Sequence, residues 1–396
     1  MSGDLTDVRT LTTCPSCGSP VGAGERFCEN CGADLPGDGA PAEGGGDGAA
    51  AGSVPTVSAH AAHGAPAVPG PVRPGVVVPD VDLTLVPTTC EACGGHVAPD
   101  GYCEECGTPA RRPRDHWLEQ PAPWVAMVCD RGVRHTRNED AGAVAATSEP
   151  GGFAVLVVCD GVSSAVDSDR ASLAAVRAAR AVLVAQPAAP SNPADAVTDD
   201  EDARRAVLED AVRRSAAAAD GEAVEAAVDP REPNPPSCTF VVAVVEGPLL
   251  VAGWVGDSRA YWLPDDGPPE QLSVDDSWAS EAMAHGMTRE EAESGPHAHA
   301  ITRWLGVDAP DPVPRTTARR LDRAGWVLVC SDGLWNYASA ADDVQRLLVD
   351  VLDGTVTAAD PARVSEELVA WANRQGGQDN VTVALARVAV EAPEPE

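Results

Sequence analysis

Four cysteine pairs with the spacing CxxC, each followed by glycine, constrain this chain more than any other feature. Two cysteines three positions apart can reach one metal ion from a tight turn, and the glycine supplies the positive φ that such a turn needs. Four thiolates in a tetrahedral arrangement favour zinc over hard cations. The pairs are Cys14/Cys17, Cys28/Cys31, Cys90/Cys93 and Cys103/Cys106.

The pairs form two repeated units, because TCPSCGSPVGAGERFCENCGADL is echoed by TCEACGGHVAPDGYCEECGTPA. Each unit has too little apolar surface to fold alone, so we expect one Zn²⁺ in each to supply the folding energy. The units resemble short zinc ribbons, predicted at residues 11–35 (zinc ribbon 1) and 88–110 (zinc ribbon 2). Disulfides or a redox CxxC are the alternatives, disfavoured by a reducing cytosol and by the missing βαβ context.

The charge balance restricts the partners. The 396 residues include 28 basic and 61 acidic ones, for a net charge of −33. Nucleic acid and anionic membranes should repel such a chain, so the sequence predicts neither as a partner. Both ribbons are acidic, which leaves contact with a protein partner, or a folded cap, as their role. All the basic residues are arginines, which excludes a P-loop lysine, a Schiff-base lysine and the lysine of a protein kinase.

The chain divides at stretches that cannot form a core. Residues 36–87 are rich in glycine, proline and alanine and contain no aromatic residue, which predicts a disordered linker. We find neither an export signal at the start nor a long uninterrupted apolar run, so we expect a cytoplasmic protein.

Residues 122–391 carry the pattern of a separate domain. Short β-branched runs and helical patterns follow one another without strict βαβ alternation, which predicts an α+β fold. The expected strands are 154–159, 240–245, 249–255, 326–330 and 381–387. The expected helices are 171–184, 203–228, 281–293, 341–352 and 361–374.

Acidic residues stand at the ends of the apolar runs. VLVVC is followed by Asp160-Gly161, and VLVCS is followed by Asp332-Gly333. An Asp-Gly pair alone is more often a turn. A carboxylate that ends a buried strand is costly unless it is used, however. Convergent carboxylates without clustered histidines form an oxygen-only site, which suits Mg²⁺ or Mn²⁺ better than Zn²⁺.

Six motifs then follow in a recognisable order. RNED, DG, GDSR, TRWLG, SDG and DN resemble the metal-dependent serine/threonine protein phosphatases of type 2C, in their bacterial branch, over residues 125–390. The resemblance implies a four-layer α-β-β-α sandwich of two antiparallel sheets with a dinuclear Mn²⁺ or Mg²⁺ site at one edge. It also implies hydrolysis of phosphoserine and phosphothreonine by a metal-activated water. The implied partners are phosphorylated proteins and the bacterial kinases that modify them.

The resemblance also assigns roles by position. Asp160 is similar to the carboxylate that bridges both metals, and Gly161 to the residue that offers its backbone carbonyl. Asp332 and Asp379 resemble direct ligands, which makes Asp160, Asp332 and Asp379 the expected catalytic set. The remaining expected metal-site residues are Glu139 and Asp140, which hold metal-bound waters, and Asp257, which implies a third ion. Asn380, Ser258 and Arg259 are expected to shape turns.

The chain departs from the family pattern at the position that binds the substrate phosphate. The family has an arginine that binds substrate phosphate where this sequence has His135. Arg134 and Arg137 flank it, and in an extended segment they would point to opposite faces. We favour Arg134, which is adjacent to the family position. A pseudophosphatase that binds phosphoproteins through the ribbons, and a small-molecule phosphatase, are the alternatives. The complete acid set favours an active protein phosphatase.

Overall fold

The computed structural model describes residues 71–85, 87–188, 198–229, 232–295, 297–298, 300–355 and 360–389. Zinc ribbon 1 and residues 36–70 of the predicted linker lie outside these ranges. Among the described helices, none has the length and apolar character needed to span a bilayer.

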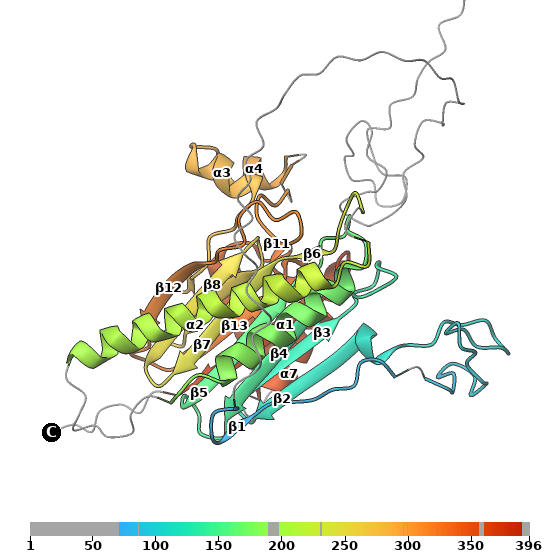
Figure 1. Cartoon of the computed structure of the whole chain (residues 1–396), viewed down its shortest axis with the longest axis horizontal. Helices are drawn as coiled ribbons and strands as arrows, with labels where there is room; N and C mark the ends of the chain where they lie inside the picture. Colours follow the sequence, from blue (N-terminus) through green and yellow to red (C-terminus); the bar gives the residue numbers. More distant parts are fainter. Residues whose placement is uncertain are drawn as a thin grey trace, which may run out of the picture.

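Two six-stranded antiparallel sheets form the centre of the described structure (Figure 1). The first sheet has the order β1 (Val76–Val77), β4 (Ala141–Thr147), β5 (Phe153–Cys159), β7 (Phe240–Glu246), β8 (Leu249–Val255) and β12 (Arg315–Arg320). The second has the order β10 (Glu270–Gln271), β9 (Arg259–Pro264), β13 (Gly325–Cys330), β14 (Val381–Val388), β3 (Val125–Asp130) and β2 (His116–Ala122). A short pair, β6 (Ser237–Cys238) with β11 (Leu305–Gly306), lies at one end.

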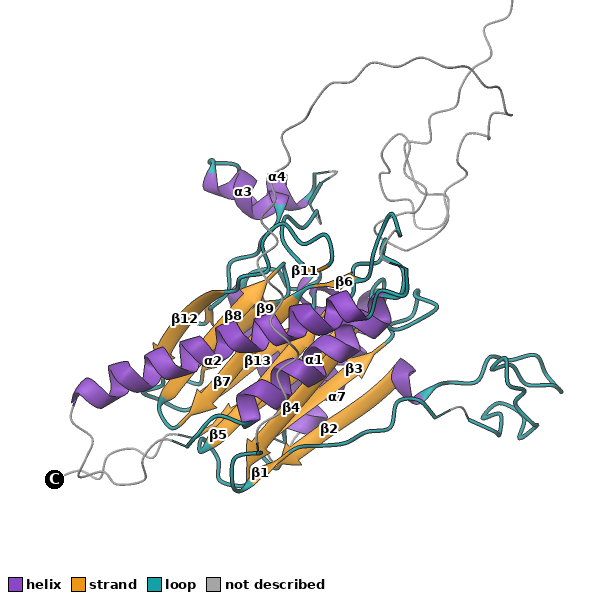
Figure 2. Ribbon diagram, viewed as in Figure 1, coloured by secondary structure: helices purple, strands orange, loops and turns teal. Residues whose placement is uncertain are grey.

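Helices cover both outer faces of this sandwich (Figure 2). The first sheet is covered by α1 (Ser168–Val184) and α2 (Thr198–Glu225), and the second by α6 (Ala341–Thr355) and α7 (Pro361–Gln375). The shorter α3 (Trp278–Ala284) and α4 (Arg289–Glu293) project beyond the strand ends, whereas α5 (Asp332–Trp335) directly follows β13. The predicted four-layer α-β-β-α architecture is confirmed.

The central strands are apolar along their whole length because both of their faces are buried. In β5, Val155 and Val157 pack under α1 and α2, whereas Leu156 between them packs against the second sheet. The strands β7, β8, β13 and β14 alternate in the same way between two cores. All five strands predicted from continuous apolar runs are present, with bounds that differ by at most one residue.

One predicted helix is broken. The pattern over 281–293 predicts a single helix, but α3 ends before His285 and α4 begins after Thr288. Gly286 lies between them with a φ of 98°, which a continuous helix does not permit. The hydroxyl of Thr288 accepts a hydrogen bond from the backbone N–H of Glu291, and the Glu291 carboxylate accepts one from the backbone N–H of Thr288. This capping box starts the second helix.

The domain begins earlier than residue 122. Val76 and Val77 pair with β4 at one edge of the first sheet, and Leu83 is buried between the sheets. The strand β2 forms an edge of the second sheet and buries Trp117. Residues 71–85 are therefore part of the fold rather than linker, and the predicted boundaries at residues 87 and 122 are wrong. Zinc ribbon 2 is an insertion between β1 and β2, and in Figure 1 it projects from the start of β2.

Candidate active site

The predicted acids meet at one end of the sandwich, because in a pair of antiparallel strands the end of one strand lies beside the start of the other. Asp160 follows the end of β5, and Asp140 precedes the start of β4, whose Ala141 lies opposite Cys159. On the second sheet, Asp332 follows β13 and Asp379 precedes β14. Cys330 at the end of β13 pairs with Val383 near the start of β14. Residues far apart in the sequence thus share one edge.

The electrostatics show that these carboxylates interact. Withdrawal from water raises the pKa of Asp160 well above its usual range, and the charges of Asp140, Asp332, Asp379 and Asp257 raise it further. Burial likewise raises the pKa values of Asp257 and Asp379, with Asp332 the next cause for both. Carboxylates raise one another's pKa values in this way only when they are close neighbours. The structure therefore brings together Asp160, Asp332, Asp379, Asp140 and Asp257.

Unsatisfied polar atoms in the cluster fit a cation. Among the described residues, Oδ1 of Asp140 and Oδ1 of Asp332 are buried and have no hydrogen-bond partner. Unpartnered buried oxygens are costly, and repulsion between neighbouring carboxylates adds to that cost. A hard divalent cation removes both penalties, and the oxygen-only donors suit Mn²⁺ or Mg²⁺.

Hydroxyl groups hold the carboxylates of Glu139 and Asp140 by hydrogen bonds. The hydroxyls of Ser331 and Thr382 donate to Oδ2 of Asp140 at 2.7 and 2.8 Å. Burial nevertheless raises the pKa of Asp140 to about 6. Ser168, at the start of α1, donates to Oε1 of Glu139 at 2.6 Å. The sequence did not reveal these three hydroxyls as partners; Ser331, in the SDG motif, was the one with a signal.

Asn380 joins the two halves of the cluster. Its Oδ1 accepts a hydrogen bond from the backbone N–H of Glu139 at 2.7 Å, and its Nδ2 donates to the carbonyls of Arg131 and Arg137. This arrangement agrees with the prediction that Asn380 has a structural role.

The glycines of the two Asp-Gly motifs permit close backbone approach. A Cβ at Gly161 would lie 2.7 Å from the carbonyl oxygen of Glu139, and one at Gly333 would lie 2.0 Å from that of Asn380. Neither glycine has a positive φ. Their function is to let the acid-bearing segments touch.

Comparison with known families identifies the family to which this chain belongs. A model described as "Protein phosphatase 2C" matches residues 131–373, which is more than half of the chain. The chain belongs to the protein phosphatase 2C family. A second model, described as "zinc-ribbon domain", matches residues 13–35. The family resemblance seen in the six motifs is confirmed.

Individual relatives are bacterial. The chain is 32% identical over 148 residues to the serine/threonine phosphatase stp of Listeria innocua, covering 37% of this chain and 55% of the relative. It is 29% identical over 258 residues to stp of Listeria monocytogenes, covering 65% and 92%. The chain thus spans about half of the length of the first of these relatives. A Streptococcus agalactiae serine/threonine phosphatase structure is similar in fold, with a TM-score of 0.53, 23% identity, and coverage of 69% of this chain and 100% of that one.

His135, where the protein phosphatase 2C family has an arginine, lies inside the acid cluster. Its side chain is 7% exposed, its Nε2 is 3.3 Å from Oδ1 of Asp379, and its Nδ1 is 3.8 Å from Oε2 of Glu139. Burial lowers the pKa of His135. The side chain is therefore placed at the site, but at neutral pH it carries less positive charge than an arginine.

The two flanking arginines are arranged opposite to our preference. The Arg137 guanidinium is half exposed and donates to Oε1 of Glu139 from Nε at 3.0 Å and from Nη2 at 2.6 Å. Arg134 is exposed, and in the described structure it has no ion pair. The expectation that the two arginines point to opposite faces assumed an extended segment. This segment is a turn, in which the N–H groups of Val133 and Arg134 both donate to the Gly377 carbonyl. The geometry favours Arg137 as the cation nearest the cluster.

A cavity of about 130 Å³ adjoins the cluster under α3 and α4. It is lined in part by Asn336, whose Nδ2 donates to Oδ2 of Asp332 at 2.9 Å. Arg259 forms its buried wall, with Nη2 2.7 Å from Oδ2 of Asp275 and the guanidinium carbon 3.6 Å from the ring centre of Trp335. Arg259, the first residue of β9, thus packs beside the site, and its part in shaping a turn stays a prediction.

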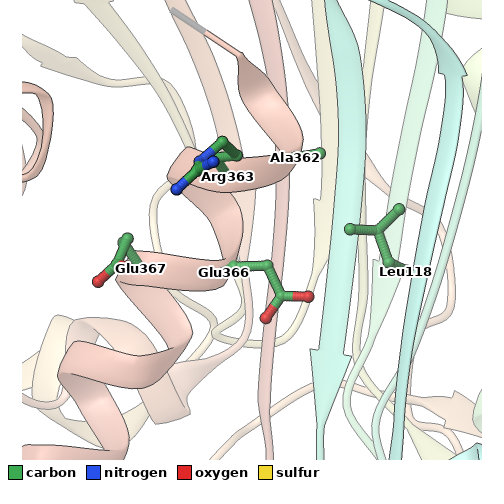
Figure 3. Close-up of a pocket in the computed structure, with 5 residues that line it drawn as sticks. All are labelled: Leu118, Ala362, Arg363, Glu366 and Glu367. Carbon is green, nitrogen blue, oxygen red and sulfur yellow. The ribbon is translucent and has the colours of Figure 1, made fainter. Parts of the chain in front are cut away.

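A larger cavity, of about 250 Å³, lies between β2 and α7. Figure 3 shows Glu366 turned toward Leu118 across it, with Arg363 and Glu367 directed away. None of its lining residues belongs to the acid cluster, so it is not the candidate active site.

Zinc ribbon 2 has the geometry of a four-thiolate site. The four Sγ atoms of Cys90, Cys93, Cys103 and Cys106 lie within 4.8 Å of one another, and none forms a disulfide. The Cys90–Cys106 and Cys93–Cys103 Sγ distances are 3.7 and 3.5 Å. A tetrahedral zinc with bonds of about 2.3 Å requires about 3.8 Å. One zinc therefore fits the described residues, and Cys14, Cys17, Cys28 and Cys31 lie outside them.

Proposed function

We propose that this protein is a phosphoprotein phosphatase that hydrolyses phosphoserine and phosphothreonine with two Mn²⁺ or Mg²⁺ ions. The observation that carries the proposal is the convergence of five aspartates at one end of the sandwich, two of which, Asp140 and Asp332, have an unpartnered buried oxygen. Such ions supply charge neutralisation for a phosphoryl group and make water more acidic. Names of bacterial relatives such as "Serine/threonine phosphatase stp" support the substrate class.

Each acid has a task that follows from its position. Asp160 interacts with all the other aspartates of the cluster and is suited to join the two ions. Asp332 and Asp379 would complete the direct ligands, and Gly161 would offer its backbone carbonyl. Asp257 is suited to the third ion that the family resemblance implied.

Glu139 and Asp140 are fixed by hydroxyl groups and are suited to orient water by accepting hydrogen bonds. Positioning of this kind, together with electrostatic stabilisation, supplies most of the catalysis in phosphoryl transfer.

Arg137 is the cation that we assign to the substrate phosphate. A guanidinium is always charged and its planar fork matches phosphate oxygens. Its contact with Glu139 aims it at the cluster, and its exposure leaves it open to substrate. His135 lies deeper and shapes the floor of the site.

Two zinc ions complete the proposed composition. The support is the four-thiolate cluster of zinc ribbon 2 and the family match over residues 13–35 for zinc ribbon 1. Bacterial serine/threonine kinases that produce the phosphoproteins are the proposed functional partners, and a protein bound by the ribbons is a further proposed partner. The cytoplasmic location remains a prediction from sequence.

The test is turnover of a phosphothreonine peptide by the full chain with and without Mn²⁺. We expect Mn²⁺-dependent release of phosphate, and its loss in Asp332→Asn with little change in melting temperature. Because His135 replaces an arginine, a pseudophosphatase is the second candidate. Tight peptide binding without turnover at saturating Mn²⁺ would establish it and refute our proposal.

A further inference from the structure

Arg114 lies directly behind the acid-bearing segment and is not part of any motif of the family. It belongs to the short 3₁₀ turn Pro113–Asp115 that leads from zinc ribbon 2 into β2. Its Nε donates to the carbonyl of Asn138 at 3.3 Å, and its Nη2 donates to the carbonyl of Asp140 at 3.2 Å. One guanidinium thus binds the peptide unit before Glu139 and the peptide unit after Asp140.

The contact is reciprocal and extends to α1. The Asn138 side chain donates from Nδ2 to the Arg114 carbonyl at 3.0 Å. Nη2 of Arg114 also donates to the carbonyl of Asp169 at 2.6 Å, next to Ser168, which binds Glu139. Arg114 therefore joins three separate segments at the place where Glu139 and Asp140 must be held.

The neighbours of Arg114 hold the other end of the same loop. The carbonyl of Asp115 accepts a hydrogen bond from the N–H of Arg131 at 2.8 Å. Nδ1 of His116 lies 2.7 Å from Oδ2 of Asp130. Both ends of the loop from Asp130 to Asp140 are thus fastened to residues 114–116.

The Arg114 guanidinium also lies over the ring of Trp117, with its central carbon 5.7 Å from the ring centre. Arg114 forms no ion pair in the described structure, and its Nη1 is buried without a partner. Burial lowers the pKa of Arg114, which is the mark of a desolvated cation. Two of its hydrogen bonds go to the carbonyls of Asn138 and Asp140, and the position of this backbone decides where the Glu139 and Asp140 carboxylates point.

We infer that Arg114 is a positioning residue that fixes Glu139 and Asp140 in the arrangement needed to bind divalent cations. This inference rests on the proposed function only in assigning the acid cluster to Mn²⁺ or Mg²⁺. Partners that orient metal-binding groups typically change metal affinity by about 10- to 100-fold when removed. The expected effect of losing Arg114 is therefore a weaker cation site on a folded protein.

The experiment titrates the full chain with Mn²⁺ and measures the unbound ion by electron paramagnetic resonance, which gives the Mn²⁺ affinity. Arg114→Ala should weaken binding by about tenfold or more. Arg114→Lys keeps the charge but lacks the planar fork, so it should weaken binding less. Activity of both variants should return at saturating Mn²⁺, because the change acts on metal binding and not on the phosphate.

Arg180→Lys is the matched control. Arg180 is a buried arginine on α1 whose Nη1 binds Oε2 of Glu119 at 2.9 Å, and it touches none of the acids. The Arg180→Lys substitution should lower the melting temperature without changing Mn²⁺ affinity. If Arg114→Ala does not fold, Arg114→Lys carries the test. Wild-type affinity in folded Arg114 variants, or an equal loss in Arg180→Lys, would overturn the inference. Mn²⁺ binding without phosphatase activity would overturn the proposed function alone.

Discussion

Replacing Asp140 with Asn should stabilise the protein without divalent cations and destabilise it relative to wild type with them. Asp140 is fully buried, and burial raises its pKa from 3.8 to about 6. Each unit of pKa shift corresponds to about 1.4 kcal/mol, so ionisation of Asp140 costs about 3 kcal/mol of folding free energy at pH 8. An asparagine does not carry this cost.

The asparagine fits the site with a small penalty. Its Oδ1 can accept the hydrogen bonds from Ser331 and Thr382, and its amide nitrogen then takes the place of the unpartnered Oδ1 of Asp140. An unpaired amide costs about 1 kcal/mol, which leaves a gain of about 2 kcal/mol. In a domain of this size that gain corresponds to roughly 4 °C in melting temperature.

The sign of the pH dependence follows from the raised pKa. Well below pH 3.8, the ordinary pKa of an aspartate, both the folded and the unfolded chain hold the proton, and Asp140 costs nothing. Between pH 4 and pH 6 the unfolded chain releases the proton while the folded chain keeps it, so wild-type stability falls as the pH rises. The advantage of Asp140→Asn should therefore be absent at pH 4 and complete at pH 8.

Thermal unfolding at pH 4 and pH 8, with and without Mn²⁺, measures these effects. A cation at 100 times its dissociation constant adds about 2.7 kcal/mol to wild type. The variant should gain less than about 0.7 kcal/mol, which outweighs its advantage of about 2 kcal/mol and reverses the order of stability. Asp210→Asn is the control, because Asp210 is an exposed residue of α2 that pairs with Arg214. An advantage of Asp140→Asn that is equal at both pH values would refute the reasoning.

Three further predictions concern other parts of the chain. A chain starting at residue 71 should melt like the full chain, whereas one starting at Pro121 should fail to fold. The shorter chain lacks Trp117 and leaves Arg180 buried without Glu119, which costs about 3–5 kcal/mol. Soluble yield and circular dichroism measure the difference. Arg137→Ala should raise the KM for phosphopeptide about tenfold or more, and Arg134→Ala should have little effect; equal, small effects would withdraw the assignment of Arg137. Elemental analysis should find two zinc ions in the full chain and one in Cys93→Ser, and a zinc-free protein purified without chelator would contradict the ribbon assignment.

The parts of the fold that could be predicted are those that bury both faces of a strand. Residues such as Val155, Leu156 and Val157 leave a continuous apolar run that can be recognised locally. The edge strand β12, with the sequence RTTARR, has no such run and depends on pairing with β8. The two residues of β1 are too few for any pattern, which is why the start of the domain was misplaced.

The residues of the site also fall into those that the sequence predicts and those that it does not. Asp160 and Asp332 could be predicted because each follows an apolar run, and the other acids because the motifs occur in the family order. The hydroxyls of Ser331, Thr382 and Ser168 could not, since they come from three elements that meet only in the fold. The preference for Arg134 stays a prediction, but its reasoning assumed an extended backbone where the chain forms a turn.

The acids that close the apolar strands also affect the chain before it folds. Runs such as those of β5, β8 and β13 are prone to pair between unfolded molecules, and a charge at the end of such a run suppresses this association. In the unfolded chain Asp160, Asp257 and Asp332 are ionised at neutral pH and act as gatekeepers. Asparagine at any of these positions removes the charge from the nascent chain and from the folded site together. A low soluble yield of such a variant therefore reports on aggregation during synthesis and is separate from its effect on cation binding.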